Sequence, residues 1–380
     1  MKLPASICRH HPTCPACPRL GLSGPAPDLV ANLKTLCAAQ GAPPPIIIEG
    51  QAPGSRRRAR LAVRGRTSSP KIGLFQAGSH RIVDIPNCPL HHPLINEAAA
   101  VIRSAVRQLG IAPYAEGPHR GKLRYLQITV ARAEERAQIV YVMNGLGASA
   151  TRPLAELVAT GLGKERVHSQ WWNGHSERGN AIFGRDFERL SGEAWFQDEV
   201  AGTPCFHHPG GFLQAQAEVF DELARQARAA VPPGARVTEF HCGAGGIGLG
   251  LLERVAHLAF NEMSPFGVAG LRHALAQGAA PLGRAVILEG PAEAHLAAIG
   301  ASDLIIADPP RRGLGPALLD ALTASPPQRL VVLHCGFRAF LSDAAHLAGA
   351  RKMRLVSAAA AELMPWTDQV ETLTVWERAR

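Results

Sequence analysis

The second half of the chain predicts an α/β fold built on a doubly wound, mainly parallel sheet. Short apolar runs, each with the length of a buried strand, alternate there with longer segments of helical or loop character. Two further β-like runs close the chain with no long helix between them, which predicts an antiparallel pair at the edge of that sheet. The runs are RVTEF, HLAFNE, AVIL, DLIIA and RLVVL, followed by RKMRLVSAAAAEL and DQVETLTVWER.

Two segments of different character precede this predicted domain, which we place at residues 206–380. Residues 1–43 are rich in Cys and Pro, and residues 44–205 mix β-like runs with helix-like stretches. The second segment therefore predicts a mixed α+β central domain. Its β-like runs are RRARLAVRG, LRYLQITV and AQIVYVM, and its helix-like stretches are INEAAAVIRSAVRQLG and TRPLAELVATGLG.

The positive charge is concentrated at the front of the chain. The net charge is +9, yet residues 1–130 hold 17 Lys and Arg against 5 Asp and Glu, and the remainder holds 23 against 26. A basic front third predicts contact with a polyanion, most simply RNA, although a solvated basic surface would give the same count. No apolar run has the length of a membrane span and the first residues lack an apolar leader, so we expect a soluble cytoplasmic protein.

The arginine cluster SRRRARLAVRGR has a period of two. Arg56, Arg58, Arg60, Arg64 and Arg66 fall on even positions, so a strand places them on one face. The alternate positions are apolar and would face a core. Such a strip suits a phosphate backbone, and it also suits a solvated edge strand that is made basic to prevent aggregation.

A glycine-rich turn follows the first strand of the C-terminal sheet, in VTEFHCGAGGIGLGLL. Glycines at such a turn let backbone amides approach a ligand at the edge of the sheet. Nucleotide, NAD and methyl-donor sites all use such a turn. Glu262 ends the next predicted strand and can accept hydrogen bonds from a ribose diol, whereas the Walker lysine is absent. Asp308 ends the strand DLIIA and opens the loop DPPRRG.

These motifs, in this order, resemble the RNA uracil-C5 methyltransferases over nearly the whole chain. The resemblance implies a Rossmann-like domain that binds S-adenosylmethionine. It assigns Cys335 in LHCG as the nucleophile, Glu371 in MPWTDQVET as the base and Arg311 in DPPRRG as a substrate contact. Without the resemblance, a structural role is the commoner one for a cysteine at a strand end such as Cys335. The donor-binding residues that the resemblance implies are Gln214 (in GGFLQAQ), Gly243, Gly245, Ile247, Glu262 and Asp308.

The chemistry of that family explains why these residue types are needed. Carbon 5 of uracil is a poor nucleophile until a thiolate adds to carbon 6. The activated ring takes a methyl group, a carboxylate removes the proton from carbon 5, and elimination releases the cysteine. The target base must leave its stack to reach the thiol.

Several positions depart from the usual family residues. Gly336 and Phe337 stand where Asn and Pro are usual, Gln369 replaces His, Glu239 replaces Asp, and Gln216 replaces Asn. One alternative is therefore an iron–sulfur RNA-binding protein with a catalytically degenerate transferase domain. Methylation of carbon 5 of cytosine, which uses similar thiol addition, is the other.

The front cysteines predict a metal or cluster site. Cys8, Cys14 and Cys17 are clustered and Cys88 lies farther along, a pattern that indicates metal binding rather than disulfides in a reducing compartment. Zinc and iron–sulfur are both compatible with these ligands, and a nearby histidine could replace one of them. The resemblance implies a [4Fe–4S] cluster with a structural or RNA-binding role. Because Cys8 is close to the start, a leading barrel domain is not expected. This layout is most similar to the 23S rRNA enzymes of the family that lack that domain, and we expect a monomer that does not act on DNA.

Overall fold

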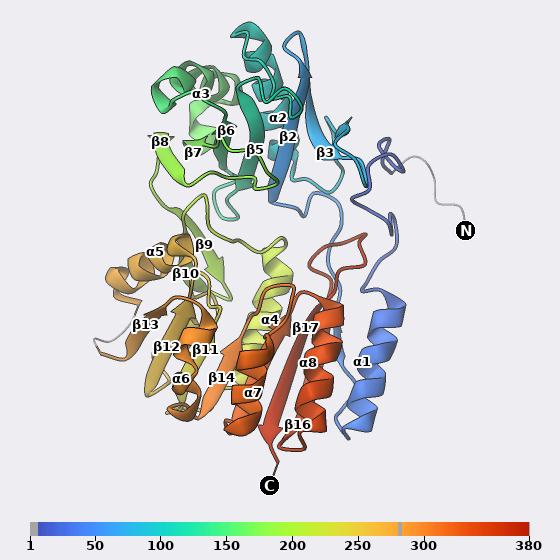
Figure 1. Ribbon diagram of the computed structural model, residues 1–380, viewed down its shortest axis with the longest axis vertical. Coiled ribbons are helices and arrows are strands. Elements are labelled where there is room, and N and C mark those ends of the chain that lie inside the picture. The colour runs from blue at the N-terminus through green and yellow to red at the C-terminus, as the bar shows by residue number, and fades with distance from the viewer. Residues whose placement is uncertain (1–6, 280–282, 380) are drawn as a thin grey trace. The chain divides into compact units, whose positions relative to one another are not determined.

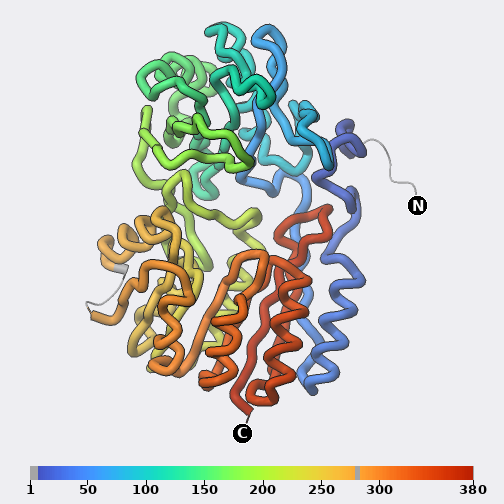
Figure 2. The backbone as a smooth tube through the Cα atoms, viewed as in Figure 1, coloured from blue at the N-terminus to red at the C-terminus, as the bar shows by residue number. Residues whose placement is uncertain are grey.

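The chain folds into two compact units in the computed structural model, which describes residues 7–279 and 283–379. The first unit comprises the residues up to Gly21 together with Gln51–Asp198, and the second comprises Leu22–Gly50 together with the residues from Glu199 onward. The sequence indicated three segments with boundaries at 43 and 205. The boundaries differ because residues 22–50 fold with the C-terminal sheet, as the blue and red tubes side by side in Figure 2 show.

The second unit contains an eight-stranded sheet in the order β1-β16-β17-β15-β14-β11-β12-β13. The five predicted strands are confirmed and run parallel, and β17 lies antiparallel between β15 and β16. The predicted antiparallel pair is confirmed, but its position at the edge is wrong. The short strand β1 pairs in parallel with β16 and covers that edge. The strands are β1 (Ile46–Ile48), β11 (Arg236–Phe240), β12 (His257–Glu262), β13 (Ala285–Glu289), β14 (Leu304–Ala307), β15 (Arg329–His334), β16 (Met353–Ala361) and β17 (Glu371–Arg378).

Helices cover both faces of this sheet (Figure 1). Neighbouring strand residues alternate between two apolar clusters, so that Ile306 packs with α4 and α5 while Ile305 packs with α1, α7 and α8. A strand buried on both faces has no polar side, which explains the continuous apolar runs in the sequence. The helices are α1 (Pro27–Ala39), α4 (Ala217–Ala229), α5 (Pro265–Ala274), α6 (Ala297–Gly300), α7 (Pro316–Ala324) and α8 (Phe337–Gly349).

The first unit contains a seven-stranded sheet in the order β4-β3-β2-β5-β6-β7-β8, with α2 (Pro93–Gln108) and α3 (Ala148–Leu162) on one face. Its neighbouring strands are antiparallel except for β6 and β7, which are parallel and joined by α3. A separate pair follows, β9 (Phe196–Val200) and β10 (Thr203–His207). The sheet strands are β2 (Arg58–Arg66), β3 (Ser69–Phe75), β4 (Ile82–Asp84), β5 (Leu123–Val130), β6 (Ala137–Met143), β7 (Val167–Gly174) and β8 (Asp186–Gly192).

Strand β2 confirms the period-two pattern but not an uninterrupted cationic strip. Its apolar positions pack under α2 and α3. On the opposite face, Arg64 is only 7% exposed, lies within 5.3 Å of the ring centroids of three aromatic side chains and forms an ion pair with Glu116. Arg56 precedes the strand. Because Arg64 is buried and paired with an acid, this surface carries less positive charge than the sequence predicts.

Within the two described ranges, every helix is too short or too polar to cross a membrane.

Candidate active site

The candidate catalytic residues of the second unit follow strand ends that meet at one edge of its sheet. Asp308 and Cys335 come directly after the neighbouring parallel strands β14 and β15. Glu371 begins β17, which runs antiparallel to β15 with His334 opposite Thr372, so the same register places Glu371 opposite Cys335. The structure thus brings together the thiol and the two carboxyls that the sequence separated by up to 63 residues.

The environment of Cys335 holds its thiol in the protonated form. Its Sγ lies 4.0 Å from the carbonyl oxygen of Pro309. Burial, followed by the negative charges of Glu371 and Asp308, raises the pKa of the Cys335 thiol to about 11, while Arg311 acts in the opposite direction. The effect is mutual, because a carboxylate that raises the pKa of the thiol has its own pKa raised by a thiolate at Cys335.

The carboxyls of the site are themselves poorly compensated. Burial, followed by Asp308, raises the pKa of Glu371 well above its ordinary value. Burial, followed by Glu262, raises the pKa of Asp308 to about 7. Glu371 Oε1 is buried and has no hydrogen-bond partner among the described residues. A buried group of acids with an unused acceptor favours a cationic ligand, because a positive charge would stabilise every ionised carboxylate.

Glutamates at the ends of β11 and β12 hold the glycine-rich loop in place. Glu262 accepts hydrogen bonds from the backbone N–H groups of Gly243, at 2.8 Å, and of Ser264, at 2.6 Å. Glu239 accepts from the N–H of Gly248 at 2.9 Å, and a Cβ on Gly248 would lie 2.2 Å from that carboxylate. The close approach explains why Gly248 must be glycine. Burial raises the pKa of Glu239 to about 8. Within the loop, Gly243 and Gly245 have positive φ values of 58° and 82°, and Ile247 is buried where the short turn η2 (Gly248–Leu251) begins.

Arg228 braces the glycine-rich loop and was not identified from the sequence. It lies on α4, and its guanidinium donates to the carbonyls of Ile247, Gly246, Val200 and Ala201 at 2.8–3.1 Å. Four carbonyl acceptors around one partly buried cation fix the backbone of the loop. In the sequence, α4 is an ordinary amphipathic helix that carries two arginines, Arg225 and Arg228, so no local signal distinguishes the second.

Gly336 has a structural explanation that the sequence did not supply. A Cβ at this position would lie 2.5 Å from the backbone oxygen of Arg311, so only glycine allows the DPPRRG loop to pass this close to the cysteine. Asp343 of α8, also missed, fixes the other end of that loop, because its Oδ2 accepts from Leu314 N at 2.8 Å and contacts His334 Nε2 at 3.0 Å. Both contacts hold the loop at the end of β15.

Two predicted residues are less closely tied to this edge. Arg311 is exposed and donates to Gln369 Oε1 at 3.0 Å, so the glutamine that replaces the usual histidine engages the substrate-side loop. Gln214 is half-buried in the loop before α4. It makes no hydrogen bond to the other predicted site residues among those the structure describes, so its role stays a prediction.

The four front cysteines line one small cavity in the first unit, of about 20 Å³, although Cys88 is remote from the others in sequence. All four are free thiols and partly buried. Burial, followed by the charge of Cys88, raises the pKa of Cys17 to about 11. Within residues 7–279 and 283–379, no three or more Cys, His, Asp or Glu side chains form a group that could hold a metal ion.

Comparison with solved structures shows the fold. The tRNA (uracil-54, C5)-methyltransferase of Pyrococcus abyssi, solved with S-adenosyl-L-homocysteine, superposes with a TM-score of 0.77 at 21% identity, over 96% of this chain and 86% of that one. The predicted Rossmann-like methyltransferase architecture is therefore confirmed for the second unit.

Comparison with curated proteins shows the family, although no protein-family model matches the chain. A 23S rRNA (uracil(747)-C(5))-methyltransferase RlmC from Edwardsiella ictaluri is 28% identical over 85% of each chain. An uncharacterized RNA methyltransferase from Gloeobacter violaceus is 29% identical over 88% of this chain and 73% of its own. Another, from Protochlamydia amoebophila, is 31% identical over 98% of both. With an identity of this level along its whole length, the chain belongs to the RNA methyltransferase family.

Proposed function

We propose that this RNA methyltransferase uses S-adenosylmethionine to methylate carbon 5 of a uridine in RNA, with 23S rRNA as the substrate. The observation that carries the proposal is the placement of Cys335 opposite Glu371 at the ends of β15 and β17. Methylation of a ring nitrogen or a ribose hydroxyl needs no thiol, because those atoms already carry a lone pair. A thiol coupled to a buried carboxyl suits a pyrimidine carbon. The choice of uracil and of 23S rRNA rests on the relatives' names.

The residues at this edge fit a cationic methyl donor. Backbone amides of the glycine-rich loop, Glu262 and Asp308 would hold it, and the donor would supply the methyl group when bound. The chain's own groups would carry out the remaining steps. Cys335, as the thiolate, adds to carbon 6 of the uracil and makes carbon 5 nucleophilic. Glu371 then removes the proton from the methylated carbon 5, and elimination restores the free thiol.

Arg311 and Gln369 would act on the substrate side of the same site. Their hydrogen bond holds the guanidinium beside the thiol and the base, where Arg311 opposes the rise in pKa of both. A cation placed there also suits the phosphate or the carbonyl oxygens of an extruded uridine. Gln214 remains a proposed donor contact on the strength of the resemblance alone.

Nucleoside analysis after incubation with 23S rRNA tests the proposal. The wild-type protein and S-adenosylmethionine should produce 5-methyluridine, and Cys335→Ala should produce none. Transcripts that contain 5-fluorouridine should form a complex that survives denaturation, because the fluorine at carbon 5 cannot be removed by a base. Binding of RNA without any covalent complex would instead favour a catalytically degenerate transferase. Methyl groups found only on cytosine would refute the uracil assignment.

We also propose that Cys8, Cys14, Cys17 and Cys88 hold a [4Fe–4S] cluster. Four free thiols around one cavity support this, and mutual charge effects on their pKa values show that the thiolates would repel one another without a cation. A cluster attaches each cysteine to a different iron, so its ligands need not converge as those of a single ion do. Protein purified without oxygen should contain about four iron and four sulfide per chain, and Cys88→Ala should lose them. Zinc in place of iron would refute the cluster.

A further inference from the structure

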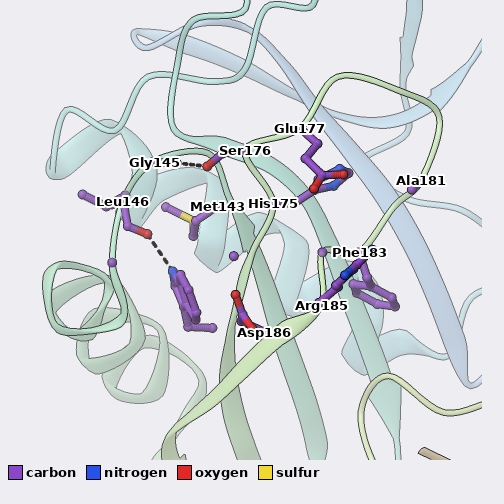
Figure 3. A pocket seen from close by; sticks show the side chains of 14 residues that line it. Met143, Gly145, Leu146, His175, Ser176, Glu177, Ala181, Phe183, Arg185 and Asp186 are labelled. Atoms are coloured by element: carbon purple, nitrogen blue, oxygen red, sulfur yellow. Dashed lines mark hydrogen bonds between the residues drawn. The ribbon is translucent and has the colours of Figure 1, made fainter. Parts of the chain in front are cut away.

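A second candidate binding site lies in the first unit, at the carboxyl ends of β6 and β7. These strands are parallel and α3 connects them, and a cavity of about 630 Å³ opens where both strands end (Figure 3). The glycines at 145 and 147 lead from β6 into α3 on one side, and the loop between β7 and β8 forms the other side. Ligands of open α/β sheets characteristically bind at this edge of such a unit.

Aromatic side chains form part of the cavity wall. Trp172 lines the cavity and is held there by a hydrogen bond from its Nε1 to the carbonyl of Leu146, at 2.6 Å. Phe183 also lines it and is fixed by Phe187, at 5.3 Å between ring centroids, and by the guanidinium of Arg60 at 5.2 Å. Rings that are held in place offer stacking surfaces at low entropic cost.

His175 presents a hydrogen-bond acceptor to the cavity. The residue lines the cavity although it is only 4% exposed, and its Nδ1 lies 3.2 Å from the carbonyl oxygen of Ile182. A carbonyl can only accept, so Nδ1 carries the proton and Nε2 of the neutral ring is an acceptor. Burial lowers the pKa of His175, which keeps the ring neutral. No partner of Nε2 is found among the residues that the structure describes.

Charged side chains complete the lining, as Figure 3 shows for Glu177, Arg185 and Asp186. The two carboxylates, like His175 Nε2, accept hydrogen bonds, so a ligand must bring N–H or O–H donors. Arg185 is exposed and favours an anionic group. The backbone amides at the start of α3 favour the same group, because no side chain caps this helix.

We propose that this cavity holds one unstacked nucleotide other than the uridine that is methylated. Its base would stack on the aromatic wall, its N–H or ribose O–H groups would meet the acceptors, and its phosphate would lie near Arg185. The inference rests on the proposed RNA function for its biological meaning, but the binding chemistry does not depend on methyl transfer. The nucleotide comes either from the RNA substrate or from free mononucleotides, and the experiment separates the two sources.

Photocrosslinking of the full chain to a 23S rRNA transcript that contains 4-thiouridine tests the proposal. Crosslinks should map to the tryptic peptides 167–178 and 179–185, which carry Trp172, His175 and Phe183. Addition of millimolar UMP, CMP, AMP or GMP distinguishes the sources. If a mononucleotide abolishes these crosslinks and no others, the cavity accepts a free nucleotide. If these crosslinks persist, the cavity takes its nucleotide from the RNA. Crosslinks confined to other peptides, with no mononucleotide binding, overturn the proposal.

Matched variants sharpen the test. His175→Asn keeps a donor for Ile182 but removes the acceptor, whereas His175→Gln places an amide near the Nε2 position, so the first should weaken crosslinking more than the second. Trp172→Leu should weaken crosslinking by about 5- to 150-fold, the range for the loss of one stacked base. Arg185→Ala is exposed and should fold normally, and it should also weaken crosslinking. Arg225→Ala, an exposed arginine on α4, is the control and should not.

Methylation measured on the same preparations separates this inference from the proposed function. In one outcome, wild-type protein makes 5-methyluridine, and the Arg185 and His175 variants have the wild-type melting temperature and an RNA affinity within twofold of the wild-type value. The nucleotide site is then refuted and the function stands. If crosslinks map to the cavity but no methyl group is transferred, the function is refuted and the site stands.

Discussion

Replacing Glu371 by Gln should make the Cys335 thiol more reactive while it abolishes methyl transfer. After burial, the charge of Glu371 is the largest cause of the raised pKa of Cys335. Glutamine has nearly the same size, so burial of the thiol is unchanged and only the charge is removed. General damage to the site would lower turnover without accelerating the thiol, so the two opposite effects together identify the electrostatic coupling.

The magnitude follows from the shift of the thiol pKa from 9 to about 11. At pH 8 this shift reduces the thiolate fraction about 100-fold. The more basic thiolate is about eightfold more nucleophilic toward disulfides, which leaves a net rate about 12-fold below that of an ordinary cysteine. Glu371 accounts for part of the shift, so the variant should react faster than wild type, and never more than about 12-fold faster.

Modification by 4,4′-dithiodipyridine at pH 8 and above measures the rate, because the raised pKa of Glu371 leaves its carboxyl neutral at lower pH. The tryptic peptide of residues 330–338 contains Cys335 as its single cysteine, so mass spectrometry follows this thiol separately from the other seven. Glu253→Gln, an exposed glutamate of the same unit, is the matched control and should leave the rate unchanged. An unchanged or slower rate in Glu371→Gln, with a wild-type melting temperature, would refute the coupling of thiol and carboxyl.

Three further predictions concern the loops around the site. S-adenosylmethionine should gain affinity over S-adenosylhomocysteine by up to about tenfold per pH unit as pH rises toward 7, and this gain should level off above 7. The raised pKa of Asp308 leaves it protonated below about 7, and only its ionised form attracts the sulfonium. Calorimetry should show no such rise for Asp308→Asn. Gly336→Ala should lower the free energy of unfolding by about 1–3 kcal/mol because its Cβ meets the Arg311 oxygen, whereas Gly349→Ala, with open space around it, should be neutral or stabilising in the same denaturant titration. Arg228→Met should lower the free energy of unfolding by about 3 kcal/mol and weaken binding of S-adenosylmethionine, because four backbone carbonyls lose the guanidinium that donates hydrogen bonds to them. Equal losses in Arg225→Ala would contradict a specific role of Arg228 in holding the loop.

The sequence predicted those parts of the fold that depend on local pattern. The five parallel strands are buried on both faces, so they appear as apolar runs, and the residues that follow them occupy one edge because parallel strands end together. Motif resemblance was needed to assign roles, above all those of Cys335 and Glu371. Their proximity then follows from the register of β15 and β17.

What the sequence did not predict depends on contacts between distant segments. Strand β1 joins the C-terminal sheet through a partner more than 300 residues away, so composition placed residues 22–43 with the front cysteines instead. Arg228 resembles its helical neighbours until the loop carbonyls surround it. Gly336 departs from the usual family residue, and only the path of the DPPRRG loop explains why. In each case the decisive partner is a backbone atom of a remote segment, which residue type does not encode.

Burial is the largest cause of the raised pKa values in the site, and these values suggest why acids surround the thiol. Burial raises the pKa of Cys335, Asp308 and Glu371, and the charges of neighbouring carboxylates raise them further: Glu371 and Asp308 act on Cys335, Glu262 on Asp308, and Asp308 on Glu371. A positive charge beside them would lower all of these pKa values together and would favour the thiolate that the proposed addition to carbon 6 requires. In the proposed reaction, loss of that charge on methyl transfer would let the pKa of Glu371 rise again, and Glu371 would then be a stronger base at the stage when the carbon-5 proton is removed. The arrangement would therefore favour the thiolate before methyl transfer and the proton acceptor after it, and the comparison of S-adenosylmethionine with S-adenosylhomocysteine across pH tests its premise, that the acids of the site respond to the sulfonium charge.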